Sequence, residues 1–229
     1  MKTTLNKTMI KKVLFLIFLN SGIIQNLLAQ EHPPFWEDVQ VIKQFDNIYN
    51  PPKNPILFIG SSSIRLWDNL ERTFAKYDAL NRGIGGAEVN HIINYADDII
   101  FPYNPREIIM YIGENDLVVK GTTADSVLIR TKRLLQIIRS KLPNIPIVYF
   151  SIKPSPSRAN YLDMAREANA LIKNYISTQK NITYIDIFNP MLNKEGKPRP
   201  ELFIDDMLHM NNKGYRIWRK KIKRHLIKK

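Results

Sequence analysis

Short runs of consecutive apolar residues recur along the chain and are separated by longer stretches of mixed polarity. Runs that are apolar at every position, rather than at every second one, are typical of strands covered on both faces of a parallel sheet. We therefore expect five buried strands, of which the second has the weakest pattern. They are Ile56–Ile59, Ala79–Asn81, Glu107–Ile112, Ile145–Ile152 and Ile182–Ile187.

The stretches between these runs carry apolar residues at a spacing of three or four, which predicts helices that pack against a sheet. A first helix is expected over Pro34–Asp46, and the proline-rich turn at 50–55 follows it. The same spacing indicates helices within 127–142, 161–176 and 215–226. Alternating strands and helices predict an α/β fold, a three-layer α/β/α sandwich around a parallel sheet.

The first 29 residues do not share this pattern. Lys2–Lys12 is basic, Val13–Leu28 is largely apolar, and Ala29 provides the small residue that signal peptidase prefers. We predict a signal peptide over residues 1–29, cleaved near Ala29, and an exported protein that is periplasmic or extracellular. The alternative is an N-terminal anchor that is retained. No repeat or linker interrupts the rest of the chain, so residues 30–229 are expected to form a single domain.

The net charge of +13, from 34 Lys and Arg against 21 Asp and Glu, is unevenly distributed. Four basic residues belong to the expected signal peptide, and nine more lie between Met207 and Lys229, where no acidic residue occurs. The remaining 21 basic residues balance the 21 acidic ones. We interpret the basic C-terminal helix as a solvated face, with peripheral contact to an anionic surface as the alternative. No nucleic-acid partner is expected.

Cysteine is absent, which excludes disulfides, thiolate metal sites and thiol nucleophiles. Any nucleophile must therefore be an oxygen or a nitrogen. The four histidines are dispersed and lack the spacing of metal ligands, so no metal or other cofactor is expected. They are His32, His91, His209 and His225.

In a parallel sheet the functional loops follow the carboxyl ends of the strands. After the first run comes Gly60-Ser61-Ser62-Ser63-Ile64-Arg65. A serine turn is typical of a helix N-cap or an anion-binding nest, and amides at a helix start can also stabilise charge that develops beside a nucleophile. The turn lacks the Gly-Lys-Ser/Thr of a P-loop, so nucleotide binding has little support.

Three later loops are also polar. The glycines of Asn81-Arg82-Gly83-Ile84-Gly85-Gly86 permit either a close approach of backbone N–H groups to a ligand or simply a turn. In Gly113-Glu114-Asn115-Asp116, the asparagine can hold an oxyanion without titrating, or it can form an Asx turn. The segment Lys153–Arg158, after the fourth run, is either part of the pocket or a rigid loop set by its prolines.

The last polar motif, Asp205-Asp206-Met207-Leu208-His209, directly precedes the C-terminal helix. A carboxylate three residues before a histidine can accept the imidazole N–H, which fixes the tautomer and leaves the other nitrogen as a base. A lone histidine is more often structural. Here the chain begins with a serine turn and closes with Asp-x-x-His, and that order favours a catalytic interpretation.

The serine turn, the glycine motif 81–86, the motif Gly113-Glu114-Asn115-Asp116 and the Asp-x-x-His motif together resemble the SGNH hydrolases, the superfamily of GDSL-type esterases and lipases. The resemblance runs from Ile56 to about Trp218, which is most of the expected mature chain. It implies a flavodoxin-like α/β/α fold with a central, mostly five-stranded parallel sheet. It also implies carboxylic ester hydrolase (acylhydrolase) activity.

The same resemblance implies a role for individual residues. Ser62 corresponds to the nucleophile, His209 to the general base and Asp206 to the carboxylate that orients it. The oxyanion hole would consist of the backbone N–H groups of Ser62 and Gly86 and the side-chain amide of Asn115.

One position departs from the family pattern. Ser61 stands where the family has aspartate, so three serines are adjacent, and Ser61 and Ser63 are alternative nucleophiles. Asp205 is likewise the alternative to Asp206, although only Asp206 has the family's spacing to His209.

The superfamily includes acetyl esterases that act on carbohydrates as well as lysophospholipases. We expect a small-molecule or glycan ester as the substrate, with a short acyl group and most simply an acetyl group on a sugar. A lysophospholipase and a non-catalytic glycan-binding module on the same fold are the alternatives. The joint presence of the five implied site residues argues against the binding module.

Overall fold

The computed structural model describes residues 32–228, and the chain divides into two compact units, 1–36 and 37–229. The described part of the first unit contains a turn at Pro34 and Phe35, followed by the first residue of helix α2 (Trp36–Tyr49). The expected signal peptide, residues 1–29, lies outside the described residues. Within residues 32–228, no helix is both long and apolar enough to cross a membrane.

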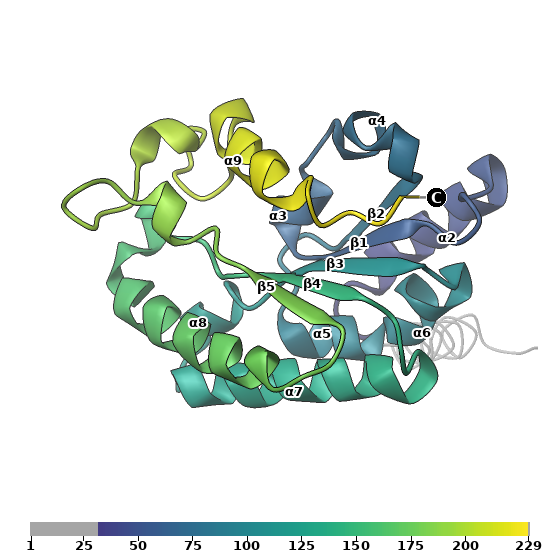
Figure 1. Ribbon diagram of the computed structural model, residues 1–229, viewed down its shortest axis with the longest axis horizontal. Helices are drawn as coiled ribbons and strands as arrows, with labels where there is room; N and C mark the ends of the chain where they lie inside the picture. The colour runs from purple at the N-terminus through teal and green to yellow at the C-terminus, as the bar shows by residue number, and fades with distance from the viewer. Residues whose placement is uncertain (1–31, 229) are drawn as a thin grey trace, which may run out of the picture. The chain divides into compact units, whose positions relative to one another are not determined.

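The second unit is built around a five-stranded parallel sheet, as Figure 1 shows. Its strands lie in the order β2-β1-β3-β4-β5, which is the flavodoxin-like order. The predicted α/β fold and the five strands are thereby confirmed. The strands are β1 (Ile56–Gly60), β2 (Ala79–Gly83), β3 (Glu107–Tyr111), β4 (Ile147–Phe150) and β5 (Ile182–Ile185).

Helices cover both faces of the sheet, which gives the three layers that the sequence predicted (Figure 1). One layer contains α5 (Val89–Asn94), α6 (Ala96–Ile99), α7 (Ala124–Lys141) and α8 (Leu162–Ser177). The other contains α3 (Ser62–Arg65), α4 (Leu70–Thr73) and α9 (Asn212–Ile222).

Two predicted helix ends are wrong, for local reasons. The first helix runs to Tyr49 rather than to Asp46, because Asn50, at φ 44°, adopts the left-handed conformation that ends a helix. The last helix ends at Ile222. Leu226 lies beyond that end and is nevertheless 7% exposed, so its apolar character reflects burial rather than helical periodicity.

An aromatic core beneath α9 holds this helix against the sheet. Trp218 is fully buried, and its ring centroid lies 4.6 Å from that of Tyr111 on β3 and 4.9 Å from that of Phe150 on β4. Burial of a large aromatic side chain stabilises a fold by about 2–3 kcal/mol. The core therefore fixes the start of α9, which lies three residues after His209, relative to the carboxyl ends of the central strands.

Candidate active site

The serine turn lies where β1 ends and α3 begins. Gly60 has a φ of +142°, and a Cβ at this position would lie 1.8 Å from the carbonyl oxygen of Tyr111, so only glycine fits. The next residue, Ser61, is the N-cap of α3, and its N–H donates to the same carbonyl (3.2 Å). The turn is therefore fixed to the end of β3, with Ser62 as the first residue of the helix.

Of the three adjacent serines in the described chain, Ser62 alone contacts His209. Ser62 Oγ–H donates to His209 Nε2 over 2.9 Å, and its side chain is partly exposed. Ser61 and Ser63 are 2% and 1% exposed, so both side chains are buried. The geometry thus favours Ser62 over the two alternative nucleophiles.

His209 is carried on a short loop, residues 203–210, which we call the histidine loop. Its ends are joined by an antiparallel bridge between Phe203 and Met210, and the N–H of Ile204 donates to the carbonyl of His209 (2.9 Å). Met207 at the tip has a φ of 56°. The loop therefore turns back on itself and directs the imidazole toward Ser62.

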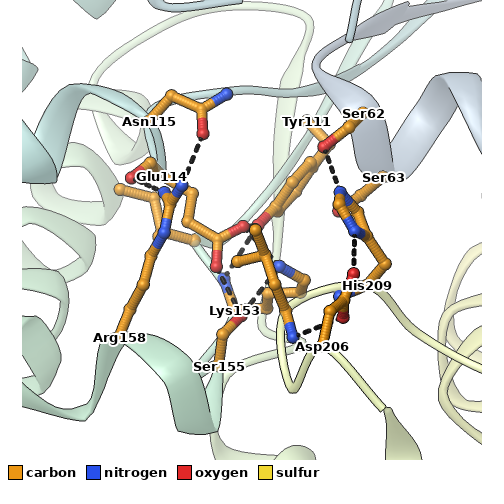
Figure 2. A network of polar contacts seen from close by, with 12 residues as sticks. Ser62, Ser63, Tyr111, Glu114, Asn115, Lys153, Ser155, Arg158, Asp206 and His209 are labelled. Atoms are coloured by element: carbon orange, nitrogen blue, oxygen red, sulfur yellow. Dashed lines mark hydrogen bonds and ion pairs between the residues drawn. The ribbon is translucent and has the colours of Figure 1, made fainter. Parts of the chain in front are cut away.

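Asp206 completes the chain of contacts, as Figure 2 shows. His209 Nδ1–H donates to Asp206 Oδ2 over 2.5 Å, and Asp206 Oδ1 accepts the backbone N–H groups of Leu208 and His209, both at 2.8 Å. Partial burial raises the pKa of the Asp206 carboxyl, but these three donors outweigh it and lower the pKa to about 2. Asp206, rather than its neighbour Asp205, is therefore the ionised partner of His209.

The loops that carry Gly86 and Asn115 reach the same edge because the strands are in register. Gly60 pairs with Gly83 on one side and with Tyr111 on the other, so the three following loops begin side by side. Gly86, at φ 79°, is exposed in its turn. We call residues 84–88 the glycine loop and residues 112–116 the asparagine loop. Asn115 Nδ2 donates to the carbonyl of Ala87, the residue after Gly86 (2.9 Å), and this hydrogen bond joins the two loops.

Asp116, which was not among the predicted site residues, makes a second link between these loops. Its carboxylate is fully buried, accepts the N–H of Val89 (3.0 Å) and pairs with Arg130 (2.9 Å). The second Asp of Gly-x-Asn-Asp thus fastens the start of α5 to the end of β3. Its role is structural support for the two expected oxyanion residues.

A cluster of charged and hydroxyl groups lies buried beneath the asparagine loop, and sequence reasoning missed it. We call Tyr111, Glu114, Lys153 and Ser155 the buried cluster; all four are less than 5% exposed. Lys153 Nζ pairs with Glu114 Oε2, and Tyr111 Oη donates to the same oxygen (2.7 Å). Ser155 Oγ donates to Glu114 Oε1 over 2.5 Å (Figure 2).

The charges in this cluster decide the state of Glu114. Burial raises the pKa of its carboxyl, but the ammonium of Lys153 and the nearby guanidinium of Arg158 together lower the pKa by more than burial raises it, so the net shift is downward. Glu114 is therefore ionised and paired.

The described residues contain no group of three or more His, Cys, Asp or Glu side chains that could hold a metal ion.

Comparisons with known proteins agree with this fold. Residues 59–217 match the GDSL-like lipase/acylhydrolase family. No curated protein matches the chain. The fold is similar to that of a GDSL-like lipase from Bacteroides thetaiotaomicron, with a TM-score of 0.69 and 20% identity over 82% of this chain and 96% of that one.

Two carbohydrate-active structures share the fold as well. For an acetyl xylan esterase, AlAXEase, the TM-score is 0.60 at 22% identity, over 76% of this chain and 100% of that one. For a family 3 carbohydrate esterase from Clostridium thermocellum, it is 0.58 at 17% identity, over 76% and 98%. At these identities the similarity establishes the fold.

Proposed function

Since the chain belongs to the GDSL-like lipase/acylhydrolase family and is a hydrolase, we propose that it is a serine esterase that removes short acyl groups, acetyl in the first place, from carbohydrates. Membership confirms the resemblance to the SGNH hydrolases that the sequence motifs indicated. The observation that carries the proposal is the hydrogen-bonded chain from Ser62 through His209 to Asp206, at 2.9 and 2.5 Å.

This geometry supports acyl transfer through a covalent intermediate. His209 Nε2 takes the proton of Ser62 Oγ as that oxygen attacks the ester carbonyl, while Asp206 stabilises the imidazolium. His209 then protonates the leaving alcohol. In the second half-reaction it activates a water molecule, which releases the acid and regenerates Ser62.

The oxyanion of each tetrahedral intermediate would be held at the carboxyl edge of the sheet. The N–H of Ser62 opens α3, where a helix offers no acceptor of its own, and the N–H of Gly86 lies in an exposed turn. Asn115 Nδ2 carries one hydrogen beyond that used by Ala87. Loss of one such donor typically lowers kcat by about 10²–10³-fold.

The surroundings of the histidine loop support a carbohydrate as the alcohol part of the substrate. A groove of about 430 Å³ separates the loop from the segment that joins α3 to α4. Carboxylate, amide and guanidinium groups beside apolar surface suit a sugar, which presents hydroxyl groups and C–H faces together. The polar residues that line it are Asp68, Asn69, Arg72, Asn211 and Asn212. The fold shared with an acetyl xylan esterase is consistent with this choice.

A lysophospholipase is the second candidate, and the basic face of α9 favours it. A groove of about 480 Å³ beside this helix is lined by Arg199, Lys220, Lys221 and Arg224. Such a cluster would attract an anionic lipid surface, and the attraction would fall as salt rises.

We further propose that the protein is exported, because residues 1–29 have the basic and apolar pattern of a signal peptide. Mass spectrometry of the secreted protein would detect cleavage after Ala29.

The test is hydrolysis of p-nitrophenyl esters of increasing acyl length, followed by acetylated xylo-oligosaccharides and lysophospholipids. Ser62→Ala should abolish acetate turnover, whereas Ser63→Ala, the matched control at the next position, should retain it. A preference for long acyl chains that weakens with salt would replace the carbohydrate proposal by the lysophospholipase. Equal activity of Ser62→Ala and the parent would refute the serine mechanism at this position.

A further inference from the structure

We propose that Arg158 is a positioning residue that sets the orientation of the Asn115 side-chain amide in the oxyanion hole. The inference rests on the proposed esterase function, because it concerns the same site. Arg158 belongs to segment 153–158 after β4, for which a pocket loop and a rigid, proline-set turn were the two expectations. Neither the family motifs nor the catalytic chain of Ser62, His209 and Asp206 includes it.

Arg158 forms two hydrogen bonds with the asparagine loop, as Figure 2 shows. Its Nη2 donates to Asn115 Oδ1 over 2.8 Å, and its Nη1 donates to the backbone carbonyl of Glu114 over 2.5 Å. A guanidinium carries donors only, in a fixed planar fork. By donating to two adjacent residues of one loop, the guanidinium therefore holds both the backbone and a side chain of that loop.

The orientation of the amide decides whether Asn115 helps or hinders the reaction. Its two ends are nearly equal in shape, but Nδ2 donates hydrogen bonds whereas Oδ1 only accepts them. An amide turned by about 180° would present Oδ1 to the oxyanion and repel it. Because Arg158 can only donate, it binds Oδ1 and leaves Nδ2 on the side of Ala87 and the glycine loop.

Arg158 is itself held by the surrounding structure. Its own N–H donates to the carbonyl of Ser155 (3.0 Å), a member of the buried cluster. The adjacent residue, Ser157, donates its N–H to the carbonyl of Met207 (3.0 Å), at the tip of the histidine loop. The segment thus joins the expected oxyanion residue to the loop of the expected general base, and its geometry is set before substrate arrives.

A double-mutant cycle on p-nitrophenyl acetate tests this inference. Asn115→Ala should lower kcat by about 10²–10³-fold. Arg158→Ala should lower kcat by about 10- to 100-fold with KM within about twofold, because the lost interaction serves the transition state. In the double variant the Arg158 substitution should add nothing, since the group through which it acts is absent. Arg133→Ala, an exposed arginine on α7, is the control and should match the parent.

Two results would overturn the inference. Full activity of Arg158→Ala would show that the amide needs no such support. Multiplicative losses in the double variant, or a rise in KM alone, would show that Arg158 contacts substrate independently of Asn115. If Arg158→Ala does not fold, Arg158→Met, which keeps the length of the side chain, enters the same cycle.

Ser62→Ala separates this inference from the function on which it rests. An inactive Ser62→Ala beside an unaffected Arg158→Ala removes only the positioning role. An active Ser62→Ala removes the proposed mechanism itself.

Discussion

The histidine loop and the buried cluster lie at the same edge of the sheet but are stabilised in opposite ways. In the histidine loop, Asp206 contacts residues two and three positions away, and its side chain is 42% exposed. In the buried cluster, Glu114 contacts Tyr111 three positions away and also Lys153 and Ser155 about forty positions away, and Lys153 has a fully buried side chain. The groups proposed to react are thus near solvent, whereas the groups that support them are sealed in the core.

This difference separates what each region contributes. Local hydrogen bonds to backbone N–H groups keep Asp206 ionised without burying it, so the reacting groups remain accessible to an ester and to water. A buried ion pair, in contrast, gains little net free energy from its attraction but becomes costly when one partner is missing. We therefore expect substitutions in the histidine loop to affect activity and substitutions in the buried cluster to affect stability.

The largest expected effect is on activity, from His209→Ala. Removal of the base should lower kcat by about 10⁶-fold, as for catalytic units in which serine and histidine act together. The free energy of unfolding should change by no more than about 1 kcal/mol, because the side chain is partly exposed. Ester hydrolysis and urea unfolding measure the two quantities.

His225→Ala is the matched control for this variant. It should retain full activity, since His225 lies beyond the end of α9. A loss of several kcal/mol of stability in His209→Ala would contradict the separation of roles, because it would make the histidine loop part of the structural core.

The next effect is on stability, from Lys153→Met. It leaves the Glu114 carboxylate buried without its ammonium partner, which should lower the free energy of unfolding by about 3–5 kcal/mol in urea at pH 7. Adding Glu114→Gln to this variant should recover part of the loss, since the remaining hydroxyl donors can then bond a neutral amide.

Lys43→Met provides the contrast, because Lys43 pairs with Asp98 (2.8 Å) at the surface, with exposed side-chain fractions of 50% and 33%. Its loss should cost no more than about 1 kcal/mol. Equal effects of the two lysine substitutions would show that burial of the cluster carries no energetic weight.

The same contrast explains which parts of the structure could be predicted from the sequence. Consecutive apolar runs identified β1, β3 and β4, which are buried at every position because a central strand is covered on both faces. The edge strands β2 and β5 were found as well, although they are less completely covered and only Ile185 of β5 is buried. The Asp206–His209 contact could be read because it is local. Helix ends were less predictable: Asn50 ended the first helix through its backbone conformation, which the apolar pattern does not encode.

The buried cluster needed the register between strands, which a single sequence does not supply. Ile108 on β3 pairs with Ile147 on β4, an offset of 39 residues, and Glu114 and Lys153 are separated by the same 39. A charged residue shortly after each of two neighbouring strands was therefore a signal. This signal predicts the Glu114–Lys153 contact only when the order and the register of the strands are known.

Glu107, the first residue of β3, sharpens the comparison because it is a buried carboxylate without a lysine partner. Glu107 is 1% exposed, and its carboxylate accepts the N–H of Ile227 (3.0 Å). Burial raises its pKa to about 7, although the N–H of Ile227 and the charge of Arg106 act in the opposite direction. Glu114 is buried as well, but its pKa is lowered, so the adjacent cation decides the sign.

The stability that depends on protonated Glu107 is present below the ordinary pKa of glutamate and is lost as the pH rises through about 7. Relative to Glu107→Gln, the parent should therefore lose about 2–3 kcal/mol of unfolding free energy between pH 5 and pH 8. Urea titrations of both proteins at the two pH values measure this difference, and the glutamine variant cancels the contributions of all other titrating groups. A constant difference would mean that Glu107 is ionised throughout, and that burial alone does not distinguish it from Glu114.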